Sequence, residues 1–176
     1  CQGDSPVSCL GTAVSDAVAG PYVNEGIMLK SGMTADQPSE DGDIYQAAEA
    51  PNTVDPVVFY DQEGRLWMIY GSYSGGIFVK EMDPQTGLAL EPGYGKKLLG
   101  GDHLRIEAPY IIYNQDTGYY YMFLSFGGLD SDGGYNVRVC RSKTPDGPYL
   151  DSMGQDMIEC KGPSGSAVWH KADGML

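Results

Sequence analysis

The chain has 176 residues, of which 41% are hydrophobic and 11% aromatic, which is enough for a globular domain with a buried core. Its formal net charge of −13 argues against nucleic acid as a partner, because phosphate binding requires a basic surface. The apolar runs are too short to span a bilayer, and 25 Gly and 11 Pro predict short strands and many turns rather than long helices.

The first predicted element is the outer part of a β unit over residues 9–32, which ends in a short apolar strand from Ile27 to Leu29. Its segment 12–22 matches residues 139–149, and both copies end in Gly-Pro-Tyr. The second copy is followed by Met157 and Ile158, which the same pattern predicts to be a short strand.

Two further segments, 55–70 and 108–124, also resemble each other. Each reads as Pro, a run of strand-forming residues, a turn with Asp or Asn and Gly, and a second strand. This order predicts two β-hairpins in matching places of a repeated unit.

Repeats of this length, made of short antiparallel strands, are typical of β-propeller blades. We therefore predict an all-β fold with about three blades over residues 1–32, 52–99 and 105–162. Residues 163–176 would begin a further blade, with a strand at 166–170. Because propellers close with about four to eight blades, the missing blades would come from the rest of the protein or from another chain.

Two carboxylates precede the apolar strands of the matching hairpins. Asp55 stands directly before Pro56, and Glu107 stands two residues before Pro109. A carboxylate at the start of an apolar strand is costly unless it is paired or functional. Two of them in equivalent places suggest acid–base chemistry at a shared site.

Five stretches carry a resemblance to a known family: Asn-Thr-Val-Asp-Pro at 52–56, residues 64–77, Arg-Ile-Glu-Ala-Pro-Tyr at 105–110, and residues 125–129 and 133–138. They resemble the five-bladed propeller of glycoside hydrolase family 43, most of all its endo-α-1,5-L-arabinanases. The resemblance implies an inverting hydrolase that cleaves α-1,5-linked L-arabinan of the plant cell wall.

By this resemblance Glu107 is the general acid, and Asp55 tunes the pKa of the acid and positions substrate. The family's general base would lie upstream of residue 1, because neither Asp4 nor Asp16 is followed by the required Pro and strand. We therefore expect the isolated chain to lack the base and to be inactive. The two carboxylates should titrate as a coupled pair.

Five other residues are candidate substrate contacts: Asn52, Ser72, Tyr73, His103 and Tyr110. Each also has a structural interpretation, as a turn cap for Asn52, a Gly-rich turn for Ser72 and Tyr73, a solvated loop for His103 and core packing for Tyr110. For the carboxylates, the structural alternatives are a strand-initiating Asp55 and an ion pair of Glu107 with Arg105.

The sequence indicates cofactors and the cellular location of the protein less directly. Cys1, Cys9, Cys140 and Cys160 lack the spacing of a zinc site, and they allow three disulfide pairings between which the sequence does not choose. The resemblance implies calcium in the complete propeller, near a His beyond residue 176, and no metal ligand in this chain. We expect an extracellular protein, with a lipid anchor on Cys1 or a periplasmic location as alternatives.

Three functional alternatives stay open. The first is an exo-acting α-L-arabinofuranosidase, and the second is a β-xylosidase of the same family. The third is a non-catalytic carbohydrate-binding propeller segment, which would bind sugar without hydrolysing it.

Overall fold

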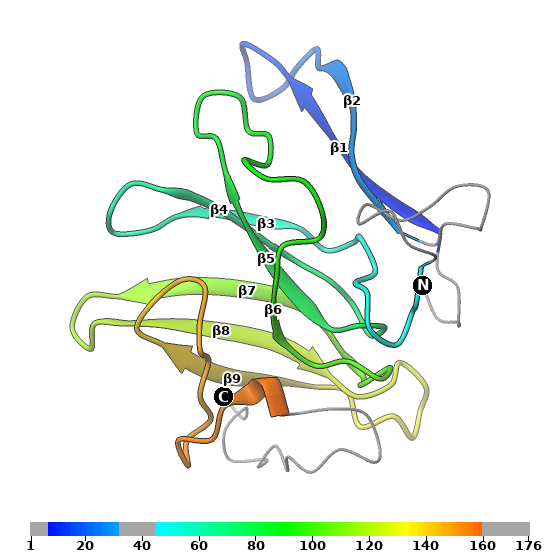
Figure 1. Ribbon diagram of the computed structural model, residues 1–176, viewed down its shortest axis with the longest axis vertical. Coiled ribbons are helices and arrows are strands. Elements are labelled where there is room, and N and C mark those ends of the chain that lie inside the picture. The colour runs from blue at the N-terminus through cyan, green and yellow to red at the C-terminus, as the bar shows by residue number, and fades with distance from the viewer. Residues whose placement is uncertain (1–6, 32–44, 160–176) are drawn as a thin grey trace.

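The computed structural model describes residues 7–31 and 45–159 and confirms the all-β prediction. Within these residues, three antiparallel sheets of two, four and three strands follow one another along the chain (Figure 1). The strands are β1 (Ser8–Val14), β2 (Val23–Ser31), β3 (Val57–Tyr60), β4 (Leu66–Tyr70), β5 (Ile77–Met82), β6 (Lys96–Leu99), β7 (Ile106–Asn114), β8 (Tyr119–Phe126) and β9 (Asn136–Ser142). In the described part of the chain, one 3-10 turn, η1, spans Met157–Glu159.

Both predicted hairpins are present. β3 pairs with β4 in the second sheet, and β7 pairs with β8 in the third. Polar side chains hold their turns: Asp61 Oδ1 accepts the backbone N–H of Glu63 at 2.9 Å, and Asn114 Oδ1 accepts that of Thr117 at 3.0 Å. Such local bonds favour Asp and Asn at turns, which is why the sequence revealed these hairpins.

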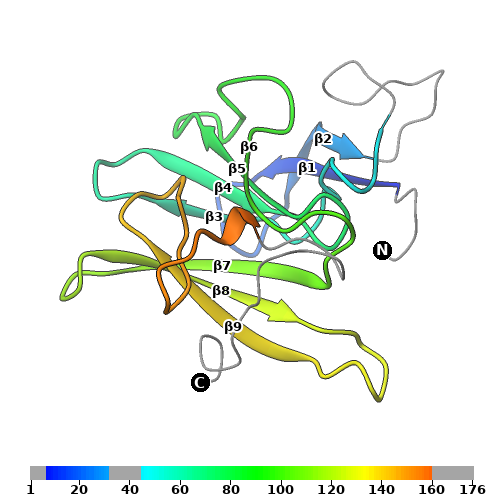
Figure 2. The same ribbon diagram turned by 60° about the horizontal axis from the view of Figure 1, so that its bottom comes forward.

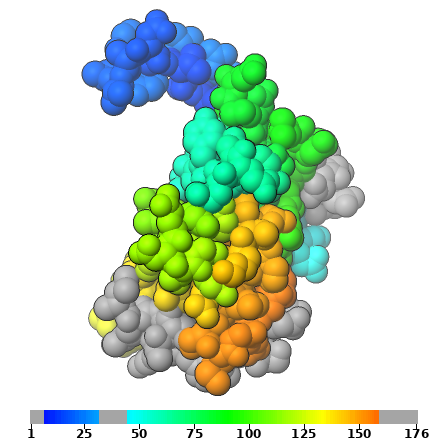
Figure 3. All heavy atoms as spheres, turned by 90° about the vertical axis from the view of Figure 1, so that its left-hand side faces the viewer, coloured from blue at the N-terminus to red at the C-terminus, as the bar shows by residue number. Residues whose placement is uncertain are grey.

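The first sheet is the hairpin β1–β2, which projects from the rest of the molecule at the top of Figure 3. Its connection and the one after β9 both contain a cis Gly-Pro bond, at Gly20-Pro21 and Gly147-Pro148. The strand predicted at Met157 and Ile158 is wrong, because these residues lie in η1. The Asp156 carboxylate accepts the N–H of Ile158 at 3.0 Å, which favours a turn over an extended strand.

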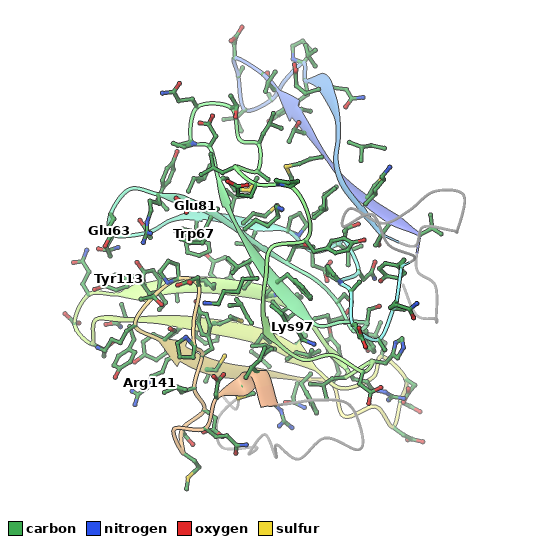
Figure 4. All side chains as sticks on the ribbon, viewed as in Figure 1. Glu63, Trp67, Glu81, Lys97, Tyr113 and Arg141 are labelled. Carbon is green, nitrogen blue, oxygen red and sulfur yellow. The ribbon has the colours of Figure 1, made fainter. Side chains whose placement is uncertain are left out.

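Two apolar clusters hold the three sheets together. The larger one lies between the second and third sheets and contains Trp67 and Ile69 from β4 and Ile111 from β7. Figure 4 labels Trp67 and Tyr113, which pack at this interface. The smaller cluster joins Leu29 of β2 to Met68 of β4. Burial between successive sheets is how propeller blades are stabilised, and the arrangement is that of a partial propeller.

The connections β4–β5, β6–β7 and β8–β9 lie at the same end of the sheets, on the right in Figures 1 and 2. β7 also begins at this end, so Glu107 lies among these loops. No helix in the described part of the chain is long and apolar enough to cross a membrane. The predicted strand at 166–170 falls outside the described residues.

Candidate active site

Glu107 lies at the start of β7, half-buried, with both carboxylate oxygens hydrogen-bonded. Ser72 Oγ donates to Oε2 at 3.0 Å, and the Tyr135 hydroxyl donates to Oε1 at 2.6 Å. Ser72 is buried and also forms an isolated backbone bridge with Glu107. Both partners are neutral hydroxyls, and no cation among the described residues forms an ion pair with Glu107.

The alternative in which Arg105 forms an ion pair with Glu107 is wrong. Among the described residues, the ion pair of Arg105 is with Asp130, with Nη1 3.8 Å from Oδ2. Both groups of that pair are exposed, so it contributes little to stability. Arg105 thus leaves the charge on Glu107 uncompensated.

Asp55 precedes β3, and its carboxylate faces the start of β7. Desolvation by the surrounding atoms raises the pKa of Asp55, repulsion from Glu107 raises it further, and a hydrogen bond from the backbone N–H of Ala108 partly offsets both. The residue itself is exposed, so the desolvation is partial. The structure therefore brings the two predicted acidic residues within electrostatic reach of each other, across the second and third sheets.

The Gly-rich loop after β4 ties this region together. Tyr73 donates its backbone N–H to Ile106 O at 2.7 Å and its hydroxyl to Gly127 O at 2.9 Å. The backbone N–H of His103 donates to Ser74 O at 3.0 Å. Ser72 thus contacts Glu107, Tyr73 bonds to the residue before it, and His103 bonds to the same loop. The hydroxyls of Ser72 and Tyr73 contact protein atoms, and substrate binding by these three residues stays a prediction.

Backbone strain concentrates in the same place. Six non-glycine residues in the described part have a positive φ: Asp55, Tyr73, Ser74, Asp102, His103 and Ala108, at 56°, 49°, 38°, 50°, 56° and 52°. Asp55 precedes β3, Tyr73 and Ser74 lie in the β4–β5 connection, Asp102 and His103 lie in the β6–β7 connection, and Ala108 directly follows Glu107. Because such conformations persist only when the surroundings enforce them, and they cluster at active sites, this strain marks the region as a candidate site.

Among the described residues, two further predicted contacts, Asn52 and Tyr110, form no hydrogen bond with Glu107. Asn52 is fully buried, and its Oδ1 accepts a hydrogen bond from Ser8 Oγ, so its contacts are those of a link to the first hairpin. The Tyr110 ring is 56% exposed and is separated from Glu107 by a β-bulge in the β7–β8 register. Substrate binding by these two residues stays a prediction.

Tyr135 is the residue that the sequence did not reveal. It lies in the connection between β8 and β9, in the stretch 133–138 that carried part of the family resemblance, and it is 28 positions from Glu107. Burial raises the pKa of Tyr135, and the hydrogen bond to Glu107 raises it further. Only the fold brings this hydroxyl to the carboxylate.

Within the described ranges, the structure shows neither a metal-binding group of side chains nor a disulfide. There, no group of three or more His, Cys, Asp or Glu side chains is arranged to hold a metal ion. Cys9 is an exposed thiol and Cys140 a buried one, whereas Cys1 and Cys160 lie outside the described ranges.

Comparison with known proteins gives one family. The family model "Glycosyl hydrolases family 43" matches residues 1–175. The extracellular endo-α-(1→5)-L-arabinanase 2 of Bacillus subtilis (strain 168) is 59% identical over 167 residues, covering 94% of this chain and 35% of that protein. The chain thus spans about a third of the length of this curated relative.

Solved structures agree in fold. The crystal structure of a glycoside hydrolase family 43 protein from Bacillus licheniformis matches with a TM-score of 0.87 and 57% identity, over 98% of this chain and 39% of that one. The crystal structure of the endo-1,5-α-L-arabinanase from Thermotoga petrophila RKU-1 matches with a TM-score of 0.84 and 55% identity, over 88% of this chain and 35% of that one.

Proposed function

Because the chain belongs to glycosyl hydrolases family 43, we propose that it carries the acid side of a hydrolase that cleaves α-1,5-linked L-arabinan. The observation that carries this proposal is the convergence of Asp55 and Glu107. Their carboxylates come from equivalent hairpins and lie close enough for the charge of Glu107 to raise the pKa of Asp55. The printed activities of the relatives support the choice of arabinan.

In the proposed reaction Glu107 donates a proton to the oxygen of the scissile bond as that bond breaks. A water molecule attacks the sugar carbon from the opposite face, so the configuration at that carbon inverts. The negative charge of Asp55 favours the protonated form of a neighbouring acid, because like charges disfavour a second ionisation. Asp55 thereby helps Glu107 to retain its proton until the leaving oxygen needs it.

The reaction also needs a general base to activate the water. Neither Asp4 nor Asp16 is followed by the required Pro and strand; Asp16 lies exposed in the β1–β2 connection, and Asp4 lies outside the described residues. We therefore propose that the base comes from outside residues 1–176. Calcium binding in the complete propeller stays a prediction, as does the secretion that the names of extracellular relatives support.

The test uses a hybrid enzyme, in which this chain replaces the matched third of the 59% identical Bacillus subtilis arabinanase. We expect the hybrid to hydrolyse arabinan and the isolated chain to show no turnover. An inactive hybrid beside an active parent enzyme would count against the proposed function. Rapid hydrolysis by the isolated chain would overturn the argument for an external base.

The role of Glu107 has a sharper test in its dependence on the leaving group. Glu107→Gln in the hybrid should lower kcat on arabinan by about 10²–10⁴-fold, the usual contribution of a general acid. A dinitrophenyl arabino-oligosaccharide needs no protonation of its leaving group, so the loss on that substrate should be much smaller. Equal losses on both substrates would remove Glu107 from the acid role.

Products of the hybrid separate the remaining alternatives. Release of oligosaccharides from linear arabinan indicates endo action, whereas release of arabinose alone indicates an exo-acting arabinofuranosidase. Hydrolysis of xylosides and not arabinan would indicate a β-xylosidase. Binding of arabinan without any hydrolysis would indicate a carbohydrate-binding segment.

A further inference from the structure

We propose that Tyr135 is a positioning residue for Glu107, which holds one carboxyl oxygen while Ser72 holds the other and so fixes the orientation of the acid. This inference rests on the proposed function of Glu107. It goes beyond that function by assigning a role to a loop residue that neither the repeat nor the position of the carboxylates indicated.

The two hydroxyls act on different oxygens. Ser72 Oγ lies 3.0 Å from Glu107 Oε2, and the Tyr135 hydroxyl lies 2.6 Å from Oε1. The last torsion of a glutamate side chain is broad and roughly two-fold, so one hydrogen bond would leave the carboxyl plane free to rotate. Two donors on opposite oxygens remove that freedom, and a fixed acid reacts faster because its orientation is set before substrate binds.

The two donors come from different sheets. Ser72 follows β4 in the second sheet, and Tyr135 precedes β9 in the third. Their loops are joined by the hydrogen bond from the Tyr73 hydroxyl to Gly127 O at 2.9 Å. The carboxyl group of Glu107 is therefore held across the interface between two sheets.

The connection that carries Tyr135 is itself braced. The N–H of Gly128 donates to Gly133 O at 2.9 Å, and the N–H of Gly133 donates to Asp130 O at 3.0 Å. Asp130 forms its ion pair with Arg105, two residues before Glu107. The backbone N–H of Gly127 donates to Arg105 O at 3.0 Å, which joins the β8–β9 connection to the residue before β7. Figure 2 shows this connection extending at the same end as the start of β7.

The hydroxyl of Tyr135 and the carboxylate of Asp55 act on Glu107 in opposite senses. A donated hydrogen bond stabilises the ionised carboxylate, whereas a neighbouring negative charge disfavours it. The bond from Tyr135 also strengthens as Glu107 loses its proton, because the acceptor becomes charged. Loss of this hydroxyl should therefore slow proton donation by Glu107.

The kinetic test is Tyr135→Phe in the hybrid enzyme. We expect kcat on arabinan to fall about 10- to 100-fold, as for the loss of a hydrogen bond to a charged group, with little change in KM. A matched control is Tyr22→Phe, which removes a hydroxyl that donates to Val18 O at 2.7 Å in the distant first hairpin. We expect no change in that variant.

An unchanged kcat in Tyr135→Phe would overturn the proposal, as would a rise in KM alone. If Glu107→Gln also left the activity unchanged, the proposed function would fail together with the positioning role. If Glu107→Gln abolished activity while Tyr135→Phe did not, only the positioning role would be lost. The two failures are thus distinguishable.

A second measurement needs no activity. In the isolated chain with ¹³C-labelled tyrosine, the raised pKa of Tyr135 can be followed by NMR. Burial is the largest cause of that shift, and the hydrogen bond to Glu107 and its charge add to it. Glu107→Gln should therefore lower the titration midpoint of Tyr135. An unmoved midpoint would show that the contact is absent in solution, and would overturn the proposal even if the hybrid variant were poorly folded.

Discussion

Asp55 and Asp61 flank the same short strand, β3, and their environments shift their pKa values in opposite directions. At Asp55, desolvation and the charge of Glu107 raise the pKa, and one backbone N–H from Ala108 only partly offsets them. At Asp61, burial alone would raise the pKa, but hydrogen bonds from Trp67, from the N–H groups of Arg65 and Glu63, and from the Arg65 side chain outweigh it and lower the pKa.

This difference in environment distinguishes a structural carboxylate from one that is available for chemistry. Asp61 Oδ2 accepts the Trp67 Nε1–H at 2.9 Å and Arg65 Nε at 2.8 Å, so its charge is fully compensated and its place is structural. The charge on Asp55 faces another carboxylate, which costs stability. An uncompensated charge of this kind is expected where chemistry needs it.

The largest effect that we expect is on catalysis, when the charge of Asp55 is removed. Asp55→Asn in the hybrid enzyme should lower kcat on arabinan about 100-fold or more, because the proposed reaction depends on the negative charge of Asp55 beside the acid. Folding should be preserved, since Asn still accepts the N–H of Ala108 and tolerates a φ of 56°. Initial rates and Tm would be measured together, with Asp16→Asn as an exposed control. A near-normal rate would exclude Asp55 from the mechanism.

The opposite end of β3 should respond in stability. Asp61→Ala leaves the indole N–H of Trp67 and two backbone N–H groups without their acceptor, and should lower the free energy of unfolding by about 3 kcal/mol. Urea unfolding of the isolated chain would measure it. A loss below about 1 kcal/mol would contradict the structural role.

The stability contributed by Asp55 and that contributed by Asp61 should change with pH in opposite directions. Asp61 contributes stability above its unfolded pKa of about 3.9, and this is lost as pH falls through its lowered folded pKa. Asp55 contributes stability that is fully present below about 3.9 and lost as pH rises through its raised folded pKa. Asp55→Asn should therefore gain stability over the parent chain as pH rises, whereas Asp61→Asn should lose it. The free energy of unfolding of both variants would be measured between acid and neutral pH. If it changed with pH in the same direction in both, the comparison would be wrong.

The smallest effect concerns the surface next to Asp61. Glu63 Oε2 lies 3.1 Å from Arg65 Nη2, with side chains 74% and 43% exposed. Exposed pairs of this kind contribute little, so Glu63→Gln should change the free energy of unfolding by less than about 0.5 kcal/mol. A loss as large as that of Asp61→Ala would mean that the turn depends on ion pairs and not on its buried hydrogen bonds.

The sequence predicted those features that depend on neighbouring residues. Asp61 and Asn114 revealed the hairpins because their side chains bond to their own turns, and Asp55 and Glu107 drew attention by preceding strands. Tyr135 could not be predicted in the same way, because a whole strand, β8, separates it from Glu107. Likewise, the burial of Asn52 depends on the first hairpin, whose placement no local pattern encodes.

The link between that hairpin and the second sheet is polar at its base. Ser31, Asn52 and Thr53 are completely buried there, and the Thr53 hydroxyl donates to Ser8 O at 2.9 Å. Apolar surfaces can shift against each other with little change in free energy, whereas hydrogen bonds are directional and permit one alignment. These hydrogen bonds thus hold the first hairpin in one alignment against the second sheet. Replacing a serine with valine at this contact should make the alignment less well defined before it lowers the stability of the contact.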